Sequence, residues 1–301
     1  MIRVLKTDLF RLFRSKVLYV YPIVVVFILI LGGVFAAVVQ KREVETPNES
    51  TEAYSEEEET DSSDNRMISV SVELNQDVIG KDNGKTIISA DTFTESLYDG
   101  SMLLFLAITV VIFCTCESRD GFIKNAVGCV DDRNYMVFSK IIIGIVAMAI
   151  YAVEFAVLNT IFTLLFGTLN GNEIVYRAIP EGEGGKYLGY LMLCILVNIT
   201  IICLLVMLHE IAHNRALGIV IGFMISAGII EDGITSLVHL LSDKITFFAN
   251  LKIEKYMLFN NISNGYKGDS YYPDTLLVMT ILYMAVFTLA AVTISKRHDV
   301  R

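Results

Sequence analysis

The stretch Tyr187–Leu208 reads YLGYLMLCILVNITIICLLVML and contains no charged residue. A helix needs about 20 mostly apolar residues to cross a hydrocarbon core of about 30 Å, so this stretch is long enough to span a membrane. Apolar stretches of similar character lie on both sides of it, at Val17–Val39, Leu97–Cys116, Phe138–Leu169, Ala216–Ile230 and Thr275–Ser295. We therefore predict an all-α integral membrane protein with six transmembrane helices.

The overall composition is typical of this class. Hydrophobic residues make up 54% of the chain, and Trp is absent, so we expect Tyr rings at the membrane interfaces. The formal net charge of −9 arises from acidic residues in the predicted outer segments, and we expect no nucleic-acid partner. The cysteines fall in predicted spans or on the predicted cytoplasmic side, so no disulfide framework is implied.

Basic residues predict the orientation. They crowd the first 16 residues, the loop between the second and third spans, and the tail after the last span. Because cytoplasmic loops carry an excess of Lys and Arg, we expect both termini in the cytoplasm. The predicted segments are a cytoplasmic interfacial helix (1–16), transmembrane helix 1 (17–39), an acidic extracellular loop (40–96), helix 2 (97–116), a cytoplasmic loop (117–137), helix 3 (138–169), an extracellular loop (170–186), helix 4 (187–208), a cytoplasmic turn (209–215), helix 5 (216–230), an extracellular segment (231–274), helix 6 (275–295) and a cytoplasmic tail (296–301).

Three segments outside these spans have patterns of their own. Residues 2–16 place apolar side chains on one helical face and basic ones mostly on the other, which predicts an amphipathic helix along the inner leaflet. In the large outer loop, apolar residues alternate from Ile68 to Leu74, and Asn83-Gly84 offers a tight turn before Thr86–Ile88, so a small β-hairpin is expected. Glu231-Asp232 ends span five, and the apolar residues 233–241 should dip back from the outer face.

Glu154 lies deep within the third apolar stretch. A charge at the bilayer centre costs about 2.5–3.5 kcal/mol on insertion scales, so such a carboxyl must be protonated, paired or in contact with water. It is either a translocation-pathway residue or a protonated group hydrogen-bonded to a neighbouring helix. We favour the pathway.

The string His209-Glu-Ile-Ala-His213 matches the zinc-metalloprotease pattern, with Glu210 in the position of the general base. Two His four residues apart share a helix face and can bind zinc. The nearest downstream carboxylate, Glu231, follows a predicted span about 22 Å long, which would place it on the opposite side of the membrane. We therefore interpret the string as a polar turn, and we expect no metal site.

The arrangement of segments resembles the six-span permease subunit of ABC-2 type exporters, in the branch associated with bacterial peptide and antibiotic export or immunity. The first helix, LKTDLFRLFRSKVLYVYPI from Leu5 to Ile23, is similar to the family pattern K-x-E-x-x-K-x-x-x-S-K, with Asp8 where Glu is common. The loop from Glu117 to Lys140 is similar to the family's coupling-helix segment.

This resemblance implies a function. The chain would be a transport subunit of the bacterial cytoplasmic membrane and not an enzyme, paired with a second permease subunit and a cytoplasmic ATPase that binds ATP and Mg²⁺. The resemblance assigns ATPase coupling to Glu117, Arg119, Gly121, Phe122, Lys124, Asn125 and Arg133. Two alternatives remain open: an intramembrane zinc protease, and a non-transporting immunity or receptor protein whose acidic outer loop binds a cationic peptide.

Overall fold

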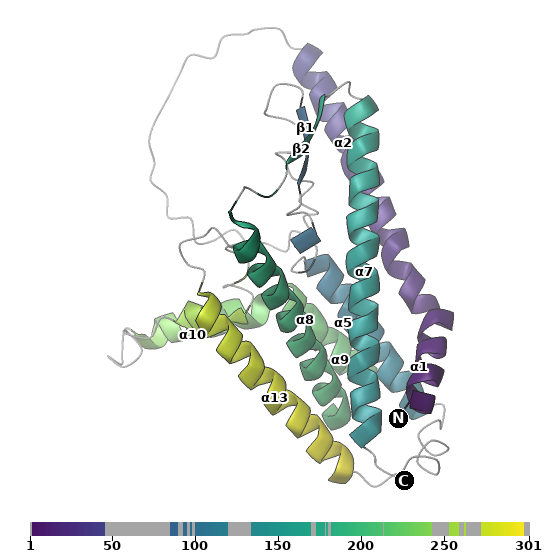
Figure 1. Cartoon of the computed structure of the whole chain (residues 1–301), viewed down its shortest axis with the longest axis vertical. Helices are drawn as coiled ribbons and strands as arrows, with labels where there is room; N and C mark the ends of the chain where they lie inside the picture. Colours follow the sequence, from purple (N-terminus) through teal and green to yellow (C-terminus); the bar gives the residue numbers. More distant parts are fainter. Residues whose placement is uncertain are drawn as a thin grey trace. The chain divides into compact units, whose positions relative to one another are not determined.

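The computed structural model describes residues 2–45, 85–89, 93–94, 97, 100–119, 134–169, 173–177, 179, 182–212, 214–242, 253–258, 262 and 272–297. The chain forms two compact units. The first contains Met1–Pro22, Ser89–Val157 and Ala178–Arg301, and the second contains Ile23–Ile88 and Leu158–Arg177. Figure 1 labels the elements in chain order.

Four helices are long and apolar enough to cross a membrane. They belong to α2 (Val20–Glu45), α7 (Asn134–Leu169), α8 (Gly184–Ala212) and α13 (Pro273–Arg297). A bent pair, α9 (Arg215–Ser226) and α10 (Ile229–Ser242), raises the number to five if it counts as one span. The protein is therefore a multi-pass membrane protein. The remaining predicted span coincides with α5 (Gly100–Arg119), whose apolar part, Gly100–Cys116, is shorter, so six crossings are not confirmed.

The N-terminal residues form the predicted helix. Helix α1 runs Ile2–Arg14 and is followed by the 3₁₀ turn η1, Lys16–Tyr19. Leu12 is fully buried, whereas Phe10 and Phe13 are exposed, as expected for an amphipathic helix. The Tyr19 hydroxyl donates to the Phe13 carbonyl oxygen at 2.9 Å and closes the turn between α1 and η1.

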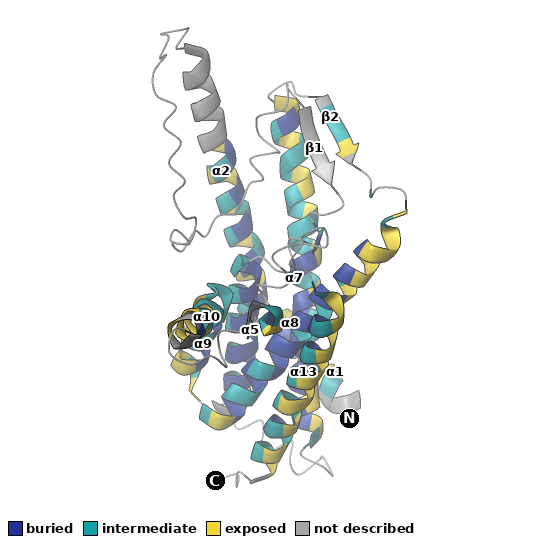
Figure 2. Ribbon diagram, turned by 90° about the vertical axis from the view of Figure 1, so that its left-hand side faces the viewer, coloured by how far each residue is buried: buried dark blue, intermediate teal, exposed yellow. Residues whose placement is uncertain are grey.

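Helix α8 lies at the centre of the first unit. Its buried residues, dark blue in Figure 2, run from Tyr187 to Glu210, whereas α13 beside it exposes much of its surface. Polar side chains of α8 form hydrogen bonds to segments packed against it. Asn198 Nδ2 donates to the Leu97 carbonyl at 2.6 Å, and the Thr200 hydroxyl donates to the Thr280 carbonyl at 3.3 Å. These residues therefore join helices, as polar groups in spans commonly do.

Small residues bring α9 and α5 together. A Cβ at Gly222 would lie 2.5 Å from the Ala107 Cβ, and one at Gly218 would lie 2.9 Å from the Val111 methyl groups. The two glycines are four residues apart and so face the same partner, which is the small-xxx-small arrangement of membrane helix pairs. Their absence of side chains sets the close approach of the two helices.

The fifth predicted span breaks inside its length. Helix α9 ends at Ser226, and α10 begins at Ile229 with a bend of 65°. Gly228 has a φ of +71°, a left-handed conformation that glycine adopts without the steric penalty of a Cβ. The prediction of one continuous helix over 216–230 is therefore wrong. Residues 233–241 belong to α10, which continues helically after the break.

The second unit contains a two-stranded sheet, in which β1 (Lys85–Ser89) pairs with β2 (Glu173–Arg177). The strand predicted at Thr86–Ile88 is thus present. The predicted hairpin is not confirmed, because its first strand, 68–74, lies outside the described residues. In the same unit α2 and the end of α7 approach closely at Gly33, where a Cβ would collide with the Phe166 ring.

Candidate functional site

A buried ion pair joins the beginning of α7 to the end of α8. Lys140 Nζ lies 2.6 Å from Glu210 Oε1, and the two side chains are only 5% and 8% exposed. A buried pair of this kind offsets the desolvation of its charges only while both partners are present. The two helices are therefore held together at this end by a contact that does not tolerate the loss of either partner.

The neighbouring residue on α7 makes a second polar contact, to α1. The Ser139 hydroxyl donates to Asp8 Oδ2 at 2.6 Å, and Arg11 Nη1 lies 3.6 Å from Asp8 Oδ1. Burial raises the pKa of the Asp8 carboxyl above its ordinary value, although the Ser139 hydrogen bond and the Arg11 and Lys140 charges act to lower the pKa. Asp8 and Ser139 thus connect the N-terminal helix to the start of α7.

The end of α5 joins the same region. The Arg11 guanidinium lies over the Phe113 ring, 5.5 Å from its centroid, a favourable cation–π distance. Arg215 Nη2 lies 3.5 Å from Cys116 Sγ and connects α5 to the beginning of α9. We define the end cluster as Asp8, Arg11, Ser139, Lys140, Glu210 and Arg215, which lie on α1, α7, α8 and α9.

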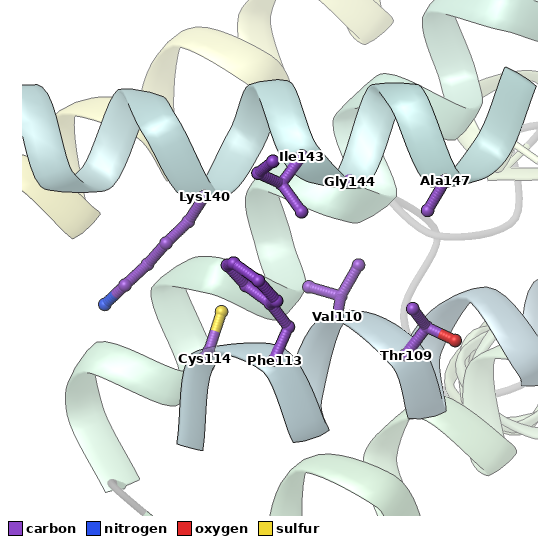
Figure 3. Close-up of a pocket in the computed structure, with 8 residues that line it drawn as sticks. All are labelled: Thr109, Val110, Phe113, Cys114, Lys140, Ile143, Gly144 and Ala147. Carbon is purple, nitrogen blue, oxygen red and sulfur yellow. The ribbon is translucent and has the colours of Figure 1, made fainter. Parts of the chain in front are cut away.

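Figure 3 shows how α5 and α7 meet beside the end cluster. Val110 and Phe113 of α5 point toward Ile143 of α7, and Lys140 extends toward the end of the helix pair. The space between these described side chains has no room for a water molecule. Gly144 permits the close approach of α7 to α8 at the same level, because a Cβ there would lie 2.5 Å from a methyl group of Ile202 on α8. A displacement of α7 at this level must therefore move its neighbours.

The residues predicted to couple to an ATPase flank or fall within one segment between α5 and α7. Gly121, Phe122, Lys124, Asn125 and Arg133 lie outside the described residues. Glu117 and Arg119 belong to the last turn of α5, although only their backbone is described. The structure thus describes the residues on either side of the segment, Arg119 at the end of α5 and Asn134 at the beginning of α7.

The structure does not place Glu154 in the end cluster. It lies fourteen residues after Lys140 on α7, about 21 Å along the helix axis at 1.5 Å per residue. Its side chain is half-buried, and the buried Oε2 has no hydrogen-bond partner among the described residues. This oxygen therefore gives no support to the hypothesis that Glu154 is hydrogen-bonded to a neighbouring helix.

The described residues of the string His209-Glu-Ile-Ala-His213 do not form the arrangement that the zinc-protease pattern predicts. Glu210, in the position of the general base, pairs with Lys140, and His209 is buried. His213 lies outside the described residues. Among the residues that were placed, no group of three or more His, Cys, Asp and Glu side chains is close enough to hold a metal ion.

The sequence reasoning missed Lys140 and Glu210 as a pair. The available signal was their position, since each is a charged residue at the end of a long apolar run. Comparison with known proteins adds no assignment, because no protein-family model matches the chain and no curated protein matches it.

Proposed function

We propose that the chain is the membrane-spanning permease subunit of an ATP-driven exporter of the ABC-2 type, in which a separate ATPase docks on residues 117–137. The observation that carries the proposal is the Lys140–Glu210 ion pair. It fixes α7, the helix that begins at the end of the docking segment, to α8 at the centre of the first unit. A push on the segment would therefore pass from α7 to α8 through this buried side-chain contact.

Two further contacts support this route. Ser139 holds α1 through Asp8, and Phe113 of α5 holds α1 through the Arg11 guanidinium. Both helices that flank the docking segment are thus attached to the same N-terminal helix. A rigid frame around a loop is the usual way in which a loop carries function.

The topology belongs to the same proposal. The chain crosses the bacterial cytoplasmic membrane six times, with α5 as the second span and the bent α9–α10 pair as the fifth. Both termini and the end cluster face the cytoplasm, as the positive-inside tendency of the sequence suggests. A second permease subunit completes the pathway, and Glu154 faces it. The substrate class that the family resemblance favours is a peptide or an antibiotic.

The protease alternative has less support. A general base in a zinc protease must be free to take a proton from the metal-bound water, whereas Glu210 accepts from Lys140 at 2.6 Å. The contact with Lys140 instead fits a structural role for Glu210.

Co-purification tests the proposal. The chain, tagged at its C-terminus, should bring down an ABC ATPase from the membranes of its native host. Phe122→Asp with Lys124→Glu should abolish this recovery, and the matched control Tyr176→Asp, on the exposed side of β2, should not. Recovery of zinc-dependent proteolysis with no ATPase would overturn the assignment.

A further inference from the structure

A cavity of about 230 Å³ lies between the N-terminal helix and α5. We name it the α1–α5 cavity. Its walls are Arg11, Arg14, Ser15 and Val17 on one side, and Thr109, Ile112, Phe113 and Cys116 on the other. About 10–15 Å³ is enough to hold one water molecule, so this cavity has room for a phosphate group and part of its ester. All of its walls belong to the first compact unit.

The charged part of the wall is suited to an anion. Arg11 lies 3.6 Å from the Asp8 carboxylate and 5.5 Å from the centroid of the Phe113 ring. Arg14 is exposed and makes no ion pair within the described part of the chain. Guanidinium groups bind phosphate oxygens through paired, charge-assisted hydrogen bonds. The hydroxyl of Ser15 adds a donor on the same wall.

The remaining wall is mostly apolar, and α1 and the turn after it expose aromatic rings. Val17, Ile112 and Phe113 line the cavity, whereas Phe10, Phe13 and Tyr19 are at least half exposed on the surface of α1 and η1. Exposed rings beside Arg side chains are typical of a helix that lies at the level of lipid headgroups. A ligand that enters here would have an anionic head and an apolar continuation.

We propose that the α1–α5 cavity binds the headgroup phosphate of an anionic phospholipid, with Arg14 and Arg11 holding the phosphate and the acyl chains remaining in the bilayer. The site requires only that α1 lie at the membrane surface, and it is independent of the exporter assignment. A soluble phosphate shares the headgroup chemistry but lacks the acyl chains, so the two sources are separable.

The test uses the full chain in detergent, titrated with dioctanoyl phosphatidylglycerol while native mass spectrometry counts the bound lipid. Arg14→Gln should raise the Kd about tenfold, the size expected for the loss of a charge-assisted contact. Ile112→Trp should weaken binding by a similar factor, because a ring placed in the cavity excludes the phosphate without changing any charge. Unchanged helicity and elution volume establish that each variant is folded.

Lys6→Gln is the matched control, since Lys6 is an exposed cation on α1 that does not line the cavity. Its Kd should stay within about twofold of the wild-type value. An equal loss in Lys6→Gln, or no loss in Arg14→Gln and Ile112→Trp, would overturn the proposal. So would displacement of the lipid by an equimolar amount of inorganic phosphate, or equal affinity for dioctanoyl phosphatidylcholine.

Discussion

Helix α7 carries one basic and one acidic side chain, Lys140 and Glu154, and they have opposite surroundings. Lys140, near the start, is buried against Glu210 at 2.6 Å. Glu154, in the middle, has a buried carboxylate oxygen without a hydrogen-bond partner among the described residues. The first belongs to the frame that the end cluster forms between α1, α7, α8 and α9, and its loss should strongly destabilise the protein. The second contributes little to the frame, in keeping with its proposed place in the transport pathway.

The largest expected effect is at the paired site. Lys140→Met leaves the Glu210 carboxylate buried without its partner, and the loss of one member of a buried pair costs about 3–5 kcal/mol. The midpoint of thermal unfolding in detergent should fall strongly. Lys296→Met, at an exposed position near the end of α13, is the control and should change little.

The double variant Lys140→Met/Glu210→Met sharpens this result. Replacement of both charges removes the desolvation penalty together with the attraction, so most of the lost stability should return. A double variant as unstable as Lys140→Met alone would mean that the pair is not the cause of the destabilisation.

A smaller loss of stability is expected from Gly144→Ala, at a position between Lys140 and Glu154 on α7. A Cβ there would lie 2.5 Å from Ile202, and overpacking of this kind costs about 1–3 kcal/mol. Gly189→Ala on α8 is the matched control, because nothing lies within 4 Å of its Cβ position. Thermal unfolding should separate the two variants, and equal behaviour would contradict the close packing of α7 on α8.

Asp8 adds a pH dependence to the frame. Burial raises the pKa of its carboxyl above the ordinary value of 3.8, so the folded protein binds this proton more tightly than the unfolded chain. The stability that this proton contributes is full below pH 3.8 and is lost as the pH rises through the raised pKa. Asp8→Asn should therefore gain stability relative to the wild type as the pH rises above 3.8. Unfolding curves over a pH series test this, and a relative loss would contradict the direction of the pKa shift.

The smallest effect is expected at Glu154. Glu154→Gln removes an ionisable group that has no described hydrogen bond at Oε2, so unfolding should change by less than about 1 kcal/mol. A destabilisation as large as that of Lys140→Met would erase the distinction between the two sites and show Glu154 to be part of the frame.

Local sequence patterns predicted much of this fold. Long apolar runs became helices, the amphipathic period of residues 2–16 became α1, and Thr86–Ile88 became a strand. Contacts between distant segments were not predictable in this way. Lys140 and Glu210 are 70 residues apart, and β1 pairs with β2 from a different loop. The break in the fifth span depends on the positive φ of Gly228, which a hydropathy window does not register. Of the predicted site, only Glu154 and the backbone of Glu117 and Arg119 lie in described residues.

The most direct test of the exporter assignment is photo-crosslinking in native membranes, with p-benzoylphenylalanine at position 122. The account predicts a crosslinked product that mass spectrometry identifies as an ABC ATPase, absent when the same probe replaces Tyr176. Capture of an ATPase by the probe at position 176 but not by the probe at position 122 would contradict it. So would a failure of probes at positions 122, 124 and 176 to capture any ATPase.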